Sequence, residues 1–427
     1  MKKIGLSLFS IFLALQIVAQ EKSYFTNPVI RGDVPDPSVI RIENTYYATG
    51  TSSEWAPFYP MFTSKDLVNW KQVGHVFTKQ PSWTSNSFWA PELFYHNNKV
   101  YCYYTARQKS TGISYIGVAT SDSPLHEFTD HGPIVEYGKE AIDAFIYDDN
   151  GQLYISWKAY GLDTRPIELL GCKLSADGLH LDGEPFTLLV DEKGIGMEGQ
   201  YHFKEGDYYY IVYAAHGCCG PSSDYDVYVA RARNYGGPYE KYPGNPILHG
   251  GEGDYKSCGH GTVVRTSDGR MFYMCHAYLK GDGFFIGRQP ILQEMEMTDD
   301  HWVRFKTGNL AIAEQPIPFV GTKQEPLSDF EDNFKGNQLK VDWTWNYPYS
   351  DIHAVLKKGK LFLSGTPKNN NKYGTALCLR PQSPQYSCET KVMNTGKGLK
   401  GLTLYGDDKN LIAWGIEGDK LILKVVK

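Results

Sequence analysis

Residues 26–320 alternate between short hydrophobic runs and polar turns, and segments with helical periodicity are nearly absent. Five of the runs are rich in aromatic residues and each follows directly on a turn; they are residues 46–50, 100–107, 153–160, 208–216 and 271–278. Their first residues are 54, 53, 55 and 63 positions apart. A hairpin repeat of this length predicts an all-β fold, a five-bladed β-propeller over residues 26–320.

One polar residue opens the strand that precedes each of these turns. The five residues are Asp36, Glu92, Asp143, Glu198 and His260. In a propeller the innermost strands line a central channel, so the repeat predicts that these side chains meet around one axis. A single Asp or Glu at such a position is more often a turn cap than a functional group. Four carboxylates in register across a repeat are harder to explain as caps.

The pattern changes after a linker at residues 316–326. Alternating strand patterns continue beyond it without the propeller period, which predicts a β-sandwich accessory domain over residues 327–427. This segment is short for such a domain. A short sandwich and a fragment of a longer one both remain open.

Residues 1–20 have the pattern of a cleavable secretory signal. Lys2 and Lys3 precede an apolar stretch at residues 4–18, and Ala19 and Gln20 precede a charged pair. The apolar stretch is too short to span a bilayer together with its flanks. We therefore expect export to the periplasm or the extracellular space, without a membrane anchor.

Composition narrows the partners and the redox chemistry. The net charge is −5 and no basic stripe stands out, so a nucleic-acid partner is not expected. Export permits disulfides among the 8 cysteines, and Cys258 and Cys275 flank one predicted hairpin. A bridge between the adjacent Cys218 and Cys219 would be strained. Buried free thiols are the expectation for most of the cysteines.

Carboxylates crowded into one cavity alter one another's pKa, because burial and like charge both oppose ionisation. An acid that keeps its proton near neutral pH, beside a second acid that is ionised, is the pair that cleavage of a glycosidic bond requires. One carboxylic acid protonates the leaving oxygen while the other carboxylate activates a water molecule.

Eight short motifs extend this reading along the chain. They are residues 35–39 (Pro-Asp-Pro-Ser-Val), 64–70 (Ser-Lys-Asp-Leu-Val-Asn-Trp), 89–92 (Trp-Ala-Pro-Glu), 142–143 (Ile-Asp), 198–199 (Glu-Gly), 218–220 (Cys-Cys-Gly), 259–261 (Gly-His-Gly) and 287–289 (Gly-Arg-Gln). In this order and spacing the chain resembles glycoside hydrolase family 43, five-bladed propeller enzymes that act on arabinose- and xylose-containing glycans. The C-terminal segment resembles the β-sandwich appended to some of the β-xylosidases and arabinofuranosidases in that family.

The resemblance implies an inverting hydrolase in which Asp36 is the general base and Glu198 is the general acid. Asp143 matches the third carboxylate, which raises the pKa of the acid and orients it. Arg288 matches a residue that contacts sugar hydroxyls near the reacting carbon. His260 matches a channel histidine that in relatives lies near a bound cation, commonly calcium; a histidine satisfied by hydrogen bonds is the alternative. No cofactor is expected to be required beyond such a structural calcium ion.

Four further residues are candidates for binding the sugar. A flat ring suits the CH face of a sugar, so Trp89 is expected in a wall of the pocket, with core packing as the equal alternative. Phe145 is a similar candidate with a stronger case for the core. Trp55 lies in a loop and is expected at the mouth of the pocket. Glu92 is expected to line the pocket without taking part in catalysis.

The sequence therefore predicts an exported glycosidase that removes terminal α-L-arabinofuranosyl or β-D-xylosyl units from plant cell-wall glycans. An endo-acting arabinanase is one alternative, and a non-catalytic carbohydrate-binding propeller is the other. An inverting mechanism further predicts that the carboxyl groups of Asp36 and Glu198 lie about 6.5–9.5 Å apart, with room for a water molecule between them.

Overall fold

The structure, a computed structural model, describes residues 23–159, 166–394 and 396–427. All regular elements in these ranges are β-strands, as predicted for an all-β chain. Within the same ranges no helix has the length and hydrophobicity that a transmembrane span needs. The signal peptide predicted for residues 1–20 lies outside the described residues.

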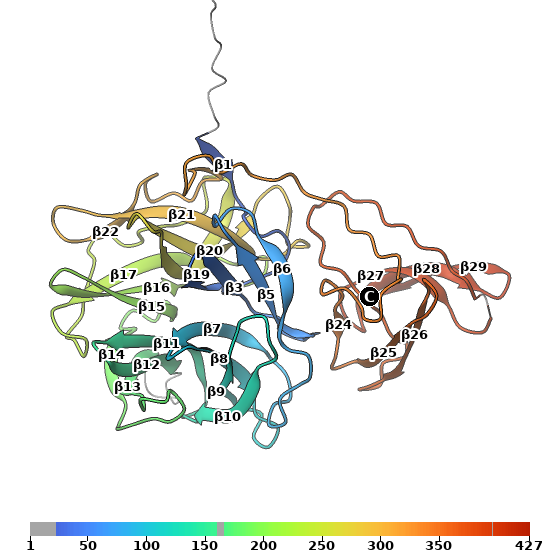
Figure 1. Ribbon diagram of the computed structural model, residues 1–427, viewed down its shortest axis with the longest axis horizontal. Helices are drawn as coiled ribbons and strands as arrows, with labels where there is room; N and C mark the ends of the chain where they lie inside the picture. The colour runs from blue at the N-terminus through green and yellow to red at the C-terminus, as the bar shows by residue number, and fades with distance from the viewer. Residues whose placement is uncertain (1–22, 160–165, 395) are drawn as a thin grey trace, which may run out of the picture.

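Five four-stranded antiparallel sheets form the larger part of the molecule, on the left of Figure 1. In chain order the sheets contain β2 (Ser38–Ile42), β3 (Thr45–Thr49), β5 (Phe58–Ser64) and β6 (Lys71–Phe77); β7 (Trp89–His96), β8 (Lys99–Arg107), β9 (Ser114–Ser121) and β10 (Thr129–Val135); β11 (Ala141–Asp149), β12 (Gln152–Ala159), β13 (Glu168–Lys173) and β14 (Phe186–Val190); β15 (Met197–Glu205), β16 (Tyr208–Ala215), β17 (Asp226–Ala232) and β18 (Glu240–Lys241); β19 (Tyr255–Arg265), β20 (Met271–Leu279), β21 (Gln289–Met297) and β22 (Val303–Phe305).

The first strand of each sheet is the innermost one. Strands β2, β7, β11, β15 and β19 contact one another in that order, and the ring closes between β19 and β2. Each aromatic-rich run of the sequence forms the second strand of its sheet. The predicted propeller is therefore confirmed, and the strands expected to line its channel do so.

The hairpins between first and second strands follow from the residues at their turns. Asn97 and Asn98 both have positive φ (49° and 59°), as do Asn150 and Gly151 (55° and 93°). A two-residue turn of type I′ requires positive φ at both central positions, and Asn and Gly accept it at low cost. These turns therefore set the register between inner and second strands.

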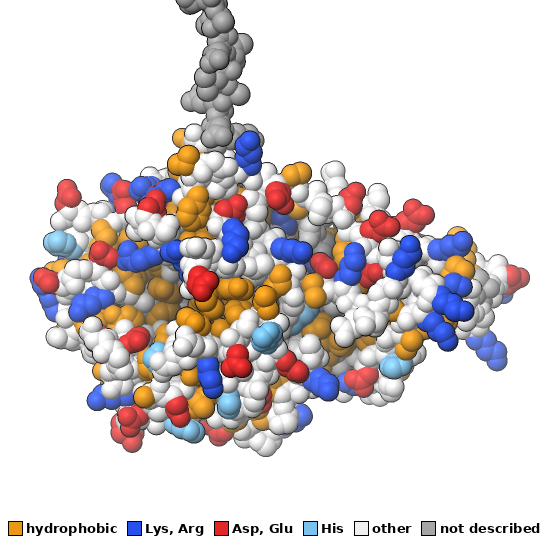
Figure 2. Space-filling model, in the orientation of Figure 1, with side chains coloured by type: hydrophobic (Ala, Val, Ile, Leu, Met, Phe, Trp, Pro, Cys, Tyr) orange, Lys and Arg blue, Asp and Glu red, His pale blue; other side chains and the backbone are white. Residues whose placement is uncertain are grey.

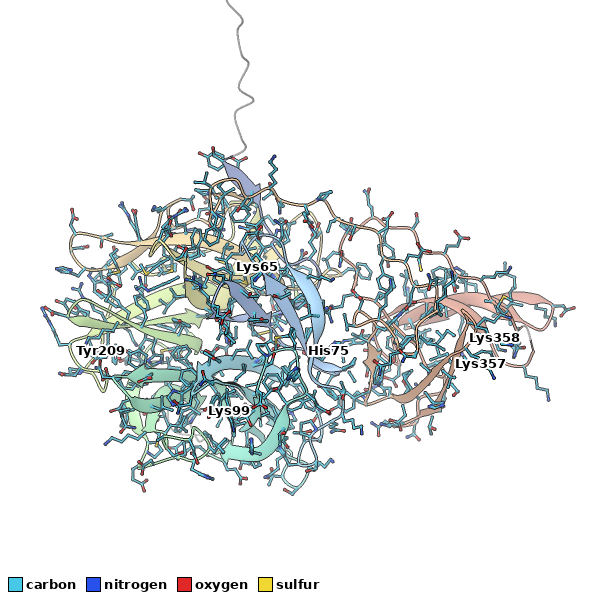
Figure 3. All side chains as sticks on the ribbon, viewed as in Figure 1. Lys65, His75, Lys99, Tyr209, Lys357 and Lys358 are labelled. Carbon is cyan, nitrogen blue, oxygen red and sulfur yellow. A yellow bond between two sulfur atoms is a disulfide. The ribbon has the colours of Figure 1, made fainter. Side chains whose placement is uncertain are left out.

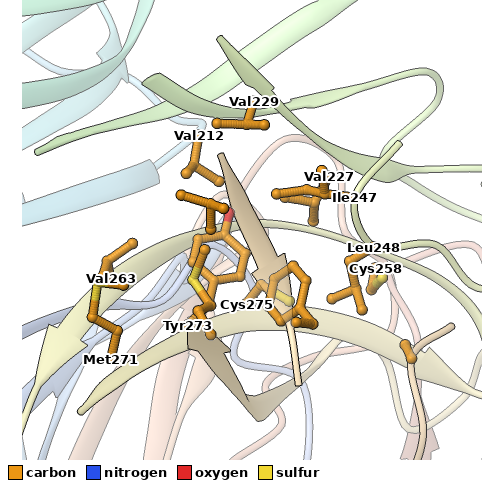
Figure 4. Close-up of a cluster of buried hydrophobic side chains, with 14 of the residues drawn as sticks. Val212, Val227, Val229, Ile247, Leu248, Cys258, Val263, Met271, Tyr273 and Cys275 are labelled. Carbon is orange, nitrogen blue, oxygen red and sulfur yellow. The ribbon is translucent and has the colours of Figure 1, made fainter. Parts of the chain in front are cut away.

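Hydrophobic clusters lie between neighbouring sheets. Ile155 and Trp157 of β12 pack with Tyr101 and Tyr103 of β8 in one of them. Figure 4 shows another, which joins the fourth and fifth sheets through side chains such as Val212 of β16. Because adjacent sheets share these clusters, the whole ring is held around its axis.

Four of the eight cysteines are buried free thiols (Cys102, Cys172, Cys258 and Cys275), so the prediction made for most of them holds for half. Cys258 and Cys275 are buried free thiols in the cluster of Figure 4, so the pairing considered for them is not formed. Cys218 and Cys219 are joined by a disulfide, and their Cα atoms are 3.7 Å apart. They lie in the loop between β16 and β17, where Gly220 has positive φ. A tight turn brings adjacent sulfur atoms together despite the strain that the sequence suggested.

The chain ends are tied to the propeller by short pairings. Strand β1 (Tyr24–Thr26) pairs with β23 (Glu314–Pro316), and β4 (Trp55–Ala56) pairs with β24 (Trp345–Asn346). The sandwich expected for residues 327–427 consists of two small antiparallel sheets. These sheets contain β25 (Ser350–Leu356) with β26 (Leu361–Pro367), and β27 (Lys400–Tyr405) with β28 (Leu411–Glu417) and β29 (Lys420–Val426).

The two parts differ on the face drawn in Figure 2. Hydrophobic side chains gather over the propeller, whereas Lys and Arg side chains gather at the far end of the C-terminal sheets. Lys357 and Lys358 lie in that region, and His75 lies on β6, toward the C-terminal sheets (Figure 3). Burial lowers the pKa of His75 to about 3. His75 is therefore neutral where the propeller meets the C-terminal segment.

The packing between sheets generates a stability prediction. Ile155 is fully buried, so Ile155→Ala should leave a cavity and lower the free energy of unfolding by about 2–5 kcal/mol. Leu125 is 58% exposed, and Leu125→Ala should change the same quantity by less than about 0.5 kcal/mol. Urea denaturation followed by tryptophan fluorescence measures both; equal effects would contradict the assignment of the core.

Candidate active site

One residue with φ in the left-handed region lies in or just before each inner strand, close to the channel. The residues are Asp36 (φ 55°), Ala90 (40°), Asp143 (59°), Gly199 (60°) and His260 (46°). The pairing of β7, β11, β15 and β19 with the next strand shifts register at these positions, as in a β-bulge. Non-glycine residues in this region are strained and concentrate at functional sites. The bulges re-aim side chains of β7, β11, β15 and β19, whereas β2 pairs with β3 without a register shift.

Asp36, Asp143 and His260 come together in the channel, as the sequence predicts. His260 Nδ1 lies 3.4 Å from Asp36 Oδ1 and 3.8 Å from Asp143 Oδ2. Gly199 permits this approach, because a Cβ atom there would lie 2.6 Å from Cγ of His260. Residues from the first, third, fourth and fifth sheets thus meet at one point.

Asp36 is buried and surrounded by donors and cations. Thr51 Oγ1 donates a hydrogen bond to Asp36 Oδ2 at 2.6 Å. Asp36 Oδ1 lies 3.5 Å from an Arg288 guanidinium nitrogen and 3.1 Å from His276 Nδ1. Burial opposes ionisation, but Arg288, His260 and His276 together hold the pKa of Asp36 well below its usual range. Asp36 is therefore a carboxylate at neutral pH.

Glu198 is held from two sides. Lys158 Nζ on β12 donates to Oε2 at 2.5 Å, and the Tyr225 hydroxyl donates to Oε1 at 2.9 Å. Burial again opposes ionisation, but the charge of Lys158 and the two hydrogen bonds lower the pKa of Glu198. The free protein thus favours an ionised Glu198, whereas the role implied for it needs a proton.

Asp143 has the opposite balance. Gly199 N–H donates to Asp143 Oδ2 at 3.1 Å. Burial raises the pKa of Asp143 to about 6, with a further contribution from Glu198 that His260 and Lys158 partly offset. Two interacting carboxyl groups titrate as a pair, so below about pH 6 the Asp143–Glu198 pair retains one proton. In the free protein that proton resides mainly on Asp143.

Glu92 and Phe145 lie along the channel, in the lining of one small cavity that also includes Asp36 and His260. A small cavity in the channel is lined by Asp36, Pro37, Ser38, Ala90, Pro91, Glu92, Ala144, Phe145, Gln200, Tyr201, His260, Gly261 and Thr262. Burial raises the pKa of Glu92 to about 8, so it is neutral at pH 7. The Phe145 ring stacks on His202, with centroids 5.3 Å apart. Phe145 is thus a buried wall of the channel, in agreement with the stronger alternative for it.

The two tryptophans occupy other surroundings. Trp89 lies on β7, with the Arg107 guanidinium 5.6 Å from its ring centroid. Trp55 lies on β4, and its ring meets Tyr405 of the C-terminal sheets edge-on with centroids 6.0 Å apart. Neither ring belongs to the lining of the small channel cavity. Contact with sugar stays a prediction for both.

His260 stays a predicted neighbour of a bound cation. Its nearest acidic neighbours, Asp36 and Asp143, both face the same nitrogen, Nδ1. Among residues 23–159, 166–394 and 396–427, no group of three or more His, Cys, Asp or Glu side chains is arranged to hold a metal ion.

Four residues at the site were not predicted from the sequence: Lys158, Tyr225, Thr51 and His276. Lys158 could have been noticed, because it is the one charged residue in the otherwise hydrophobic run 153–160. His276 likewise interrupts the apolar run 271–278. Tyr225 lies in a loop, and it fits because a Cβ atom on Gly259 would come within 2.4 Å of its ring. Its position depends on the packing of two sheets, which local sequence does not encode.

The raised pKa of Asp143 predicts a pH-dependent gain in stability when its charge is removed. A carboxyl group that titrates near pH 6 when folded, against about 3.9 when unfolded, costs stability as the pH rises through that window. Asp143→Asn should therefore raise the free energy of unfolding at pH 7 by up to about 3 kcal/mol, from two pKa units at 1.4 kcal/mol each. The gain should vanish near pH 4. Urea unfolding at both pH values measures it, and an equal effect at both would refute the burial argument.

Two family models match the chain. The model described as glycosyl hydrolases family 43 matches residues 25–303. The model described as the beta xylosidase C-terminal concanavalin A-like domain matches residues 331–427. The two matches cover the propeller and the C-terminal sheets.

Individual proteins agree with these models. The chain is 28% identical to a xylan 1,3-beta-xylosidase from Vibrio sp. over 415 residues, 89% of this chain and 76% of that protein. It is 28% identical to the non-reducing end alpha-L-arabinofuranosidase BoGH43B of Bacteroides ovatus over 431 residues, 95% of this chain and 78% of that protein.

A solved structure with the same fold is the xylan beta-1,4-xylosidase from Bacillus halodurans. It superposes with a TM-score of 0.76 at 22% identity, over 94% of this chain and 82% of that one. The family model spans well over half of the sequence, and the propeller, the acidic centre and both relatives agree with it. The chain therefore belongs to glycosyl hydrolases family 43.

Proposed function

We propose that the protein is an exo-acting, inverting glycosidase that removes terminal α-L-arabinofuranosyl or β-D-xylosyl units from plant cell-wall glycans. The relatives named as xylosidase and arabinofuranosidase support this substrate class. The signal-like residues 1–20 support export to the periplasm or the extracellular space.

One observation carries the proposal: carboxyl groups with opposite protonation face one centre. Asp36 is ionised beside Arg288, and the Asp143–Glu198 pair retains a proton to about pH 6. An ionised base together with a protonated acid is the combination that inversion at an anomeric carbon requires. No structural role needs this division of protons.

In the proposed reaction, a water molecule loses a proton to Asp36 while its oxygen forms a bond to the anomeric carbon. The bond from that carbon to the leaving oxygen breaks, and Glu198 gives its proton to that oxygen. Asp143 supplies the proton that the acid needs, because the two carboxyl groups share one. Arg288 keeps Asp36 ionised and lies close enough to it to reach hydroxyls of the reacting sugar.

The alternatives fit less well. A carbohydrate-binding propeller needs aromatic rings but gains nothing from a buried Asp36 that Arg288 keeps ionised. The relative named as a non-reducing end alpha-L-arabinofuranosidase supports action on chain ends over cleavage within a chain.

Removal of either catalytic carboxylate should abolish most of the activity. Asp36→Asn should lower kcat by about 10²–10⁴ on every substrate, since no other group activates water. Glu198→Gln should lower kcat similarly on oligosaccharides, but less on 4-nitrophenyl glycosides, whose leaving group needs little help from an acid. Initial rates on 4-nitrophenyl arabinofuranoside, 4-nitrophenyl xyloside, arabino-oligosaccharides and xylo-oligosaccharides test both.

Asp299 is exposed, so Asp299→Asn serves as the control, and its kcat on each substrate should equal that of the wild-type protein. Proton NMR of the first product should show the inverted anomer, as the predicted spacing of Asp36 and Glu198 requires. Negligible release by the wild-type protein, equal to that of both variants, would favour the carbohydrate-binding alternative. A retained anomer would exclude the inverting assignment.

The role of Asp143 predicts a shift in the pH–rate profile. Without its charge the pair no longer holds a shared proton, so Asp143→Asn should move the alkaline limb of kcat/KM to lower pH by about one unit or more. The profile of kcat/KM between pH 4 and 9 measures the limb. An unmoved limb would show that Asp143 does not set the protonation of the acid.

A further inference from the structure

Lys158 is a buried lysine at the centre of the site. It is 4% exposed, in β12 between Trp157 and Ala159, which are both fully buried. A buried ammonium group is costly unless a carboxylate compensates it, and Glu198 does so at 2.5 Å. A lysine at this depth is therefore tied to Glu198 in both position and charge.

Lys158 and Tyr225 together fix the orientation of Glu198. They donate to different oxygens, Oε2 and Oε1, so the carboxyl plane is defined by two contacts from different sheets. Lys158 comes from the third sheet and Tyr225 from the loop that precedes β17 in the fourth. A proton donor that must face a leaving oxygen gains from this restraint, because misplacement of a catalytic group by about 1 Å costs about 100-fold in rate.

The charge of Lys158 opposes the chemistry that Glu198 performs. The charged and titratable groups that face Glu198 are Lys158, Tyr225, Asp143 and His260, with Asp36 beyond them. Asp143 favours a protonated neighbour, whereas Lys158 favours an ionised one. The two groups act on the same carboxyl in opposite directions, Asp143 from near the start of β11 and Lys158 from β12.

We propose that Lys158 is a positioning residue of the proposed reaction, which clamps the carboxyl group of Glu198 and sets the pH above which the Asp143–Glu198 pair loses its shared proton. The inference rests on the proposed function and adds to it a group on the second strand of the third sheet. It assigns to Lys158 the upper limit of the working pH range. It also explains why the resting acid is ionised: the cation stabilises it until a glycan occupies the site.

The test uses the pH profile of Lys158→Met, which keeps the length of the side chain and removes the charge. The alkaline limb of kcat/KM should move to higher pH by about one unit or more, opposite to the shift expected for Asp143→Asn. The kcat on the acid plateau should fall about tenfold or more, because one of the two contacts that orient Glu198 is lost. Lys158→Arg keeps the charge, so the alkaline limb of its kcat/KM profile should lie at the same pH as in the wild-type protein.

Lys306→Met is a matched control. Lys306 also pairs with a buried glutamate, Glu294, at 2.8 Å, but on the fifth sheet away from the channel. Lys306→Met should leave both kcat and the alkaline limb of the kcat/KM profile unchanged. Tyr225→Phe removes the other contact without removing a charge, so kcat should fall while the limb moves less than in Lys158→Met.

The outcomes separate the inference from the function on which it rests. If the wild-type protein releases no pentose from any substrate, the proposed function fails, whatever the variants do. If the wild-type protein is active and Lys158→Met lowers kcat/KM by one factor at every pH, Lys158 is structural and the inference is overturned. Circular dichroism of each variant establishes that it is folded.

A direct titration covers the case in which Lys158→Met does not fold. Carboxyl carbon NMR of the wild-type protein labelled at Glu and Asp, with Glu198→Gln and Asp143→Asn for assignment, follows both groups. Glu198 should ionise at lower pH than Asp143. The reverse order would overturn the inference.

Discussion

The site depends on a backbone constraint that recurs around the channel, a residue with left-handed φ in or just before each inner strand. Asp36, Asp143 and His260 pay for this geometry with strain of about 1–3 kcal/mol each, since none of them is glycine. A regular strand would point alternate side chains up and down its own sheet and would leave these groups apart. The hydrophobic clusters shared by adjacent sheets hold the inner strands in place, so the strain persists. The packing of the ring is thus what keeps the acids together.

Electrostatic balance decides what each acid can do once it is in place. Asp36 is buried and Glu198 is partly buried, and each has its own cation, Arg288 and Lys158. Asp143 has no dedicated cation of this kind, and its pKa is the one that rises. Burial alone would have raised all three, so the cations create the division into ionised and protonated groups. Removing one partner of such a pair leaves an uncompensated charge, which is why the pairs are coupled to the fold.

Much of the fold could be predicted because the hairpin repeat is local in sequence. The spacing of the aromatic runs identified the second strand of every sheet, and turn residues such as Asn150 and Gly151 fixed the hairpins. The site was predicted less evenly. Asp36 and Asp143 occupy the left-handed positions themselves, whereas Glu198 lies one residue before its bulge and Glu92 two residues after. That offset sends Glu92 along the channel, and no feature of a single strand reveals it.

The groups that tune the acids could not be predicted for a different reason. Lys158 lies on a second strand, and Tyr225 lies in a loop of the next sheet. The contact of Lys158 with Glu198 arises where the third and fourth sheets pack, whereas the contact of Tyr225 joins two parts of the fourth sheet; the sequence separations are 40 and 27 residues. The sequence repeat identifies positions that are equivalent in all five sheets. Lys158 and Tyr225 matter because they differ from the residues at the equivalent positions of the other sheets. Physical coupling between sheets is therefore the part of the site that needed the structure.

The C-terminal segment contacts two loops next to the same centre. Trp55, which the sequence places at the mouth of the pocket, meets Tyr405 and lies in the pairing of β4 with β24. Trp55 lies four residues after Thr51, which donates a hydrogen bond to Asp36. On the other side, Phe285 stacks on Tyr386 with centroids 6.4 Å apart, three residues before Arg288. The C-terminal segment thus braces the two loops that carry the partners of Asp36, so its docking bears on the ionised base although it contributes no acid of its own to the centre.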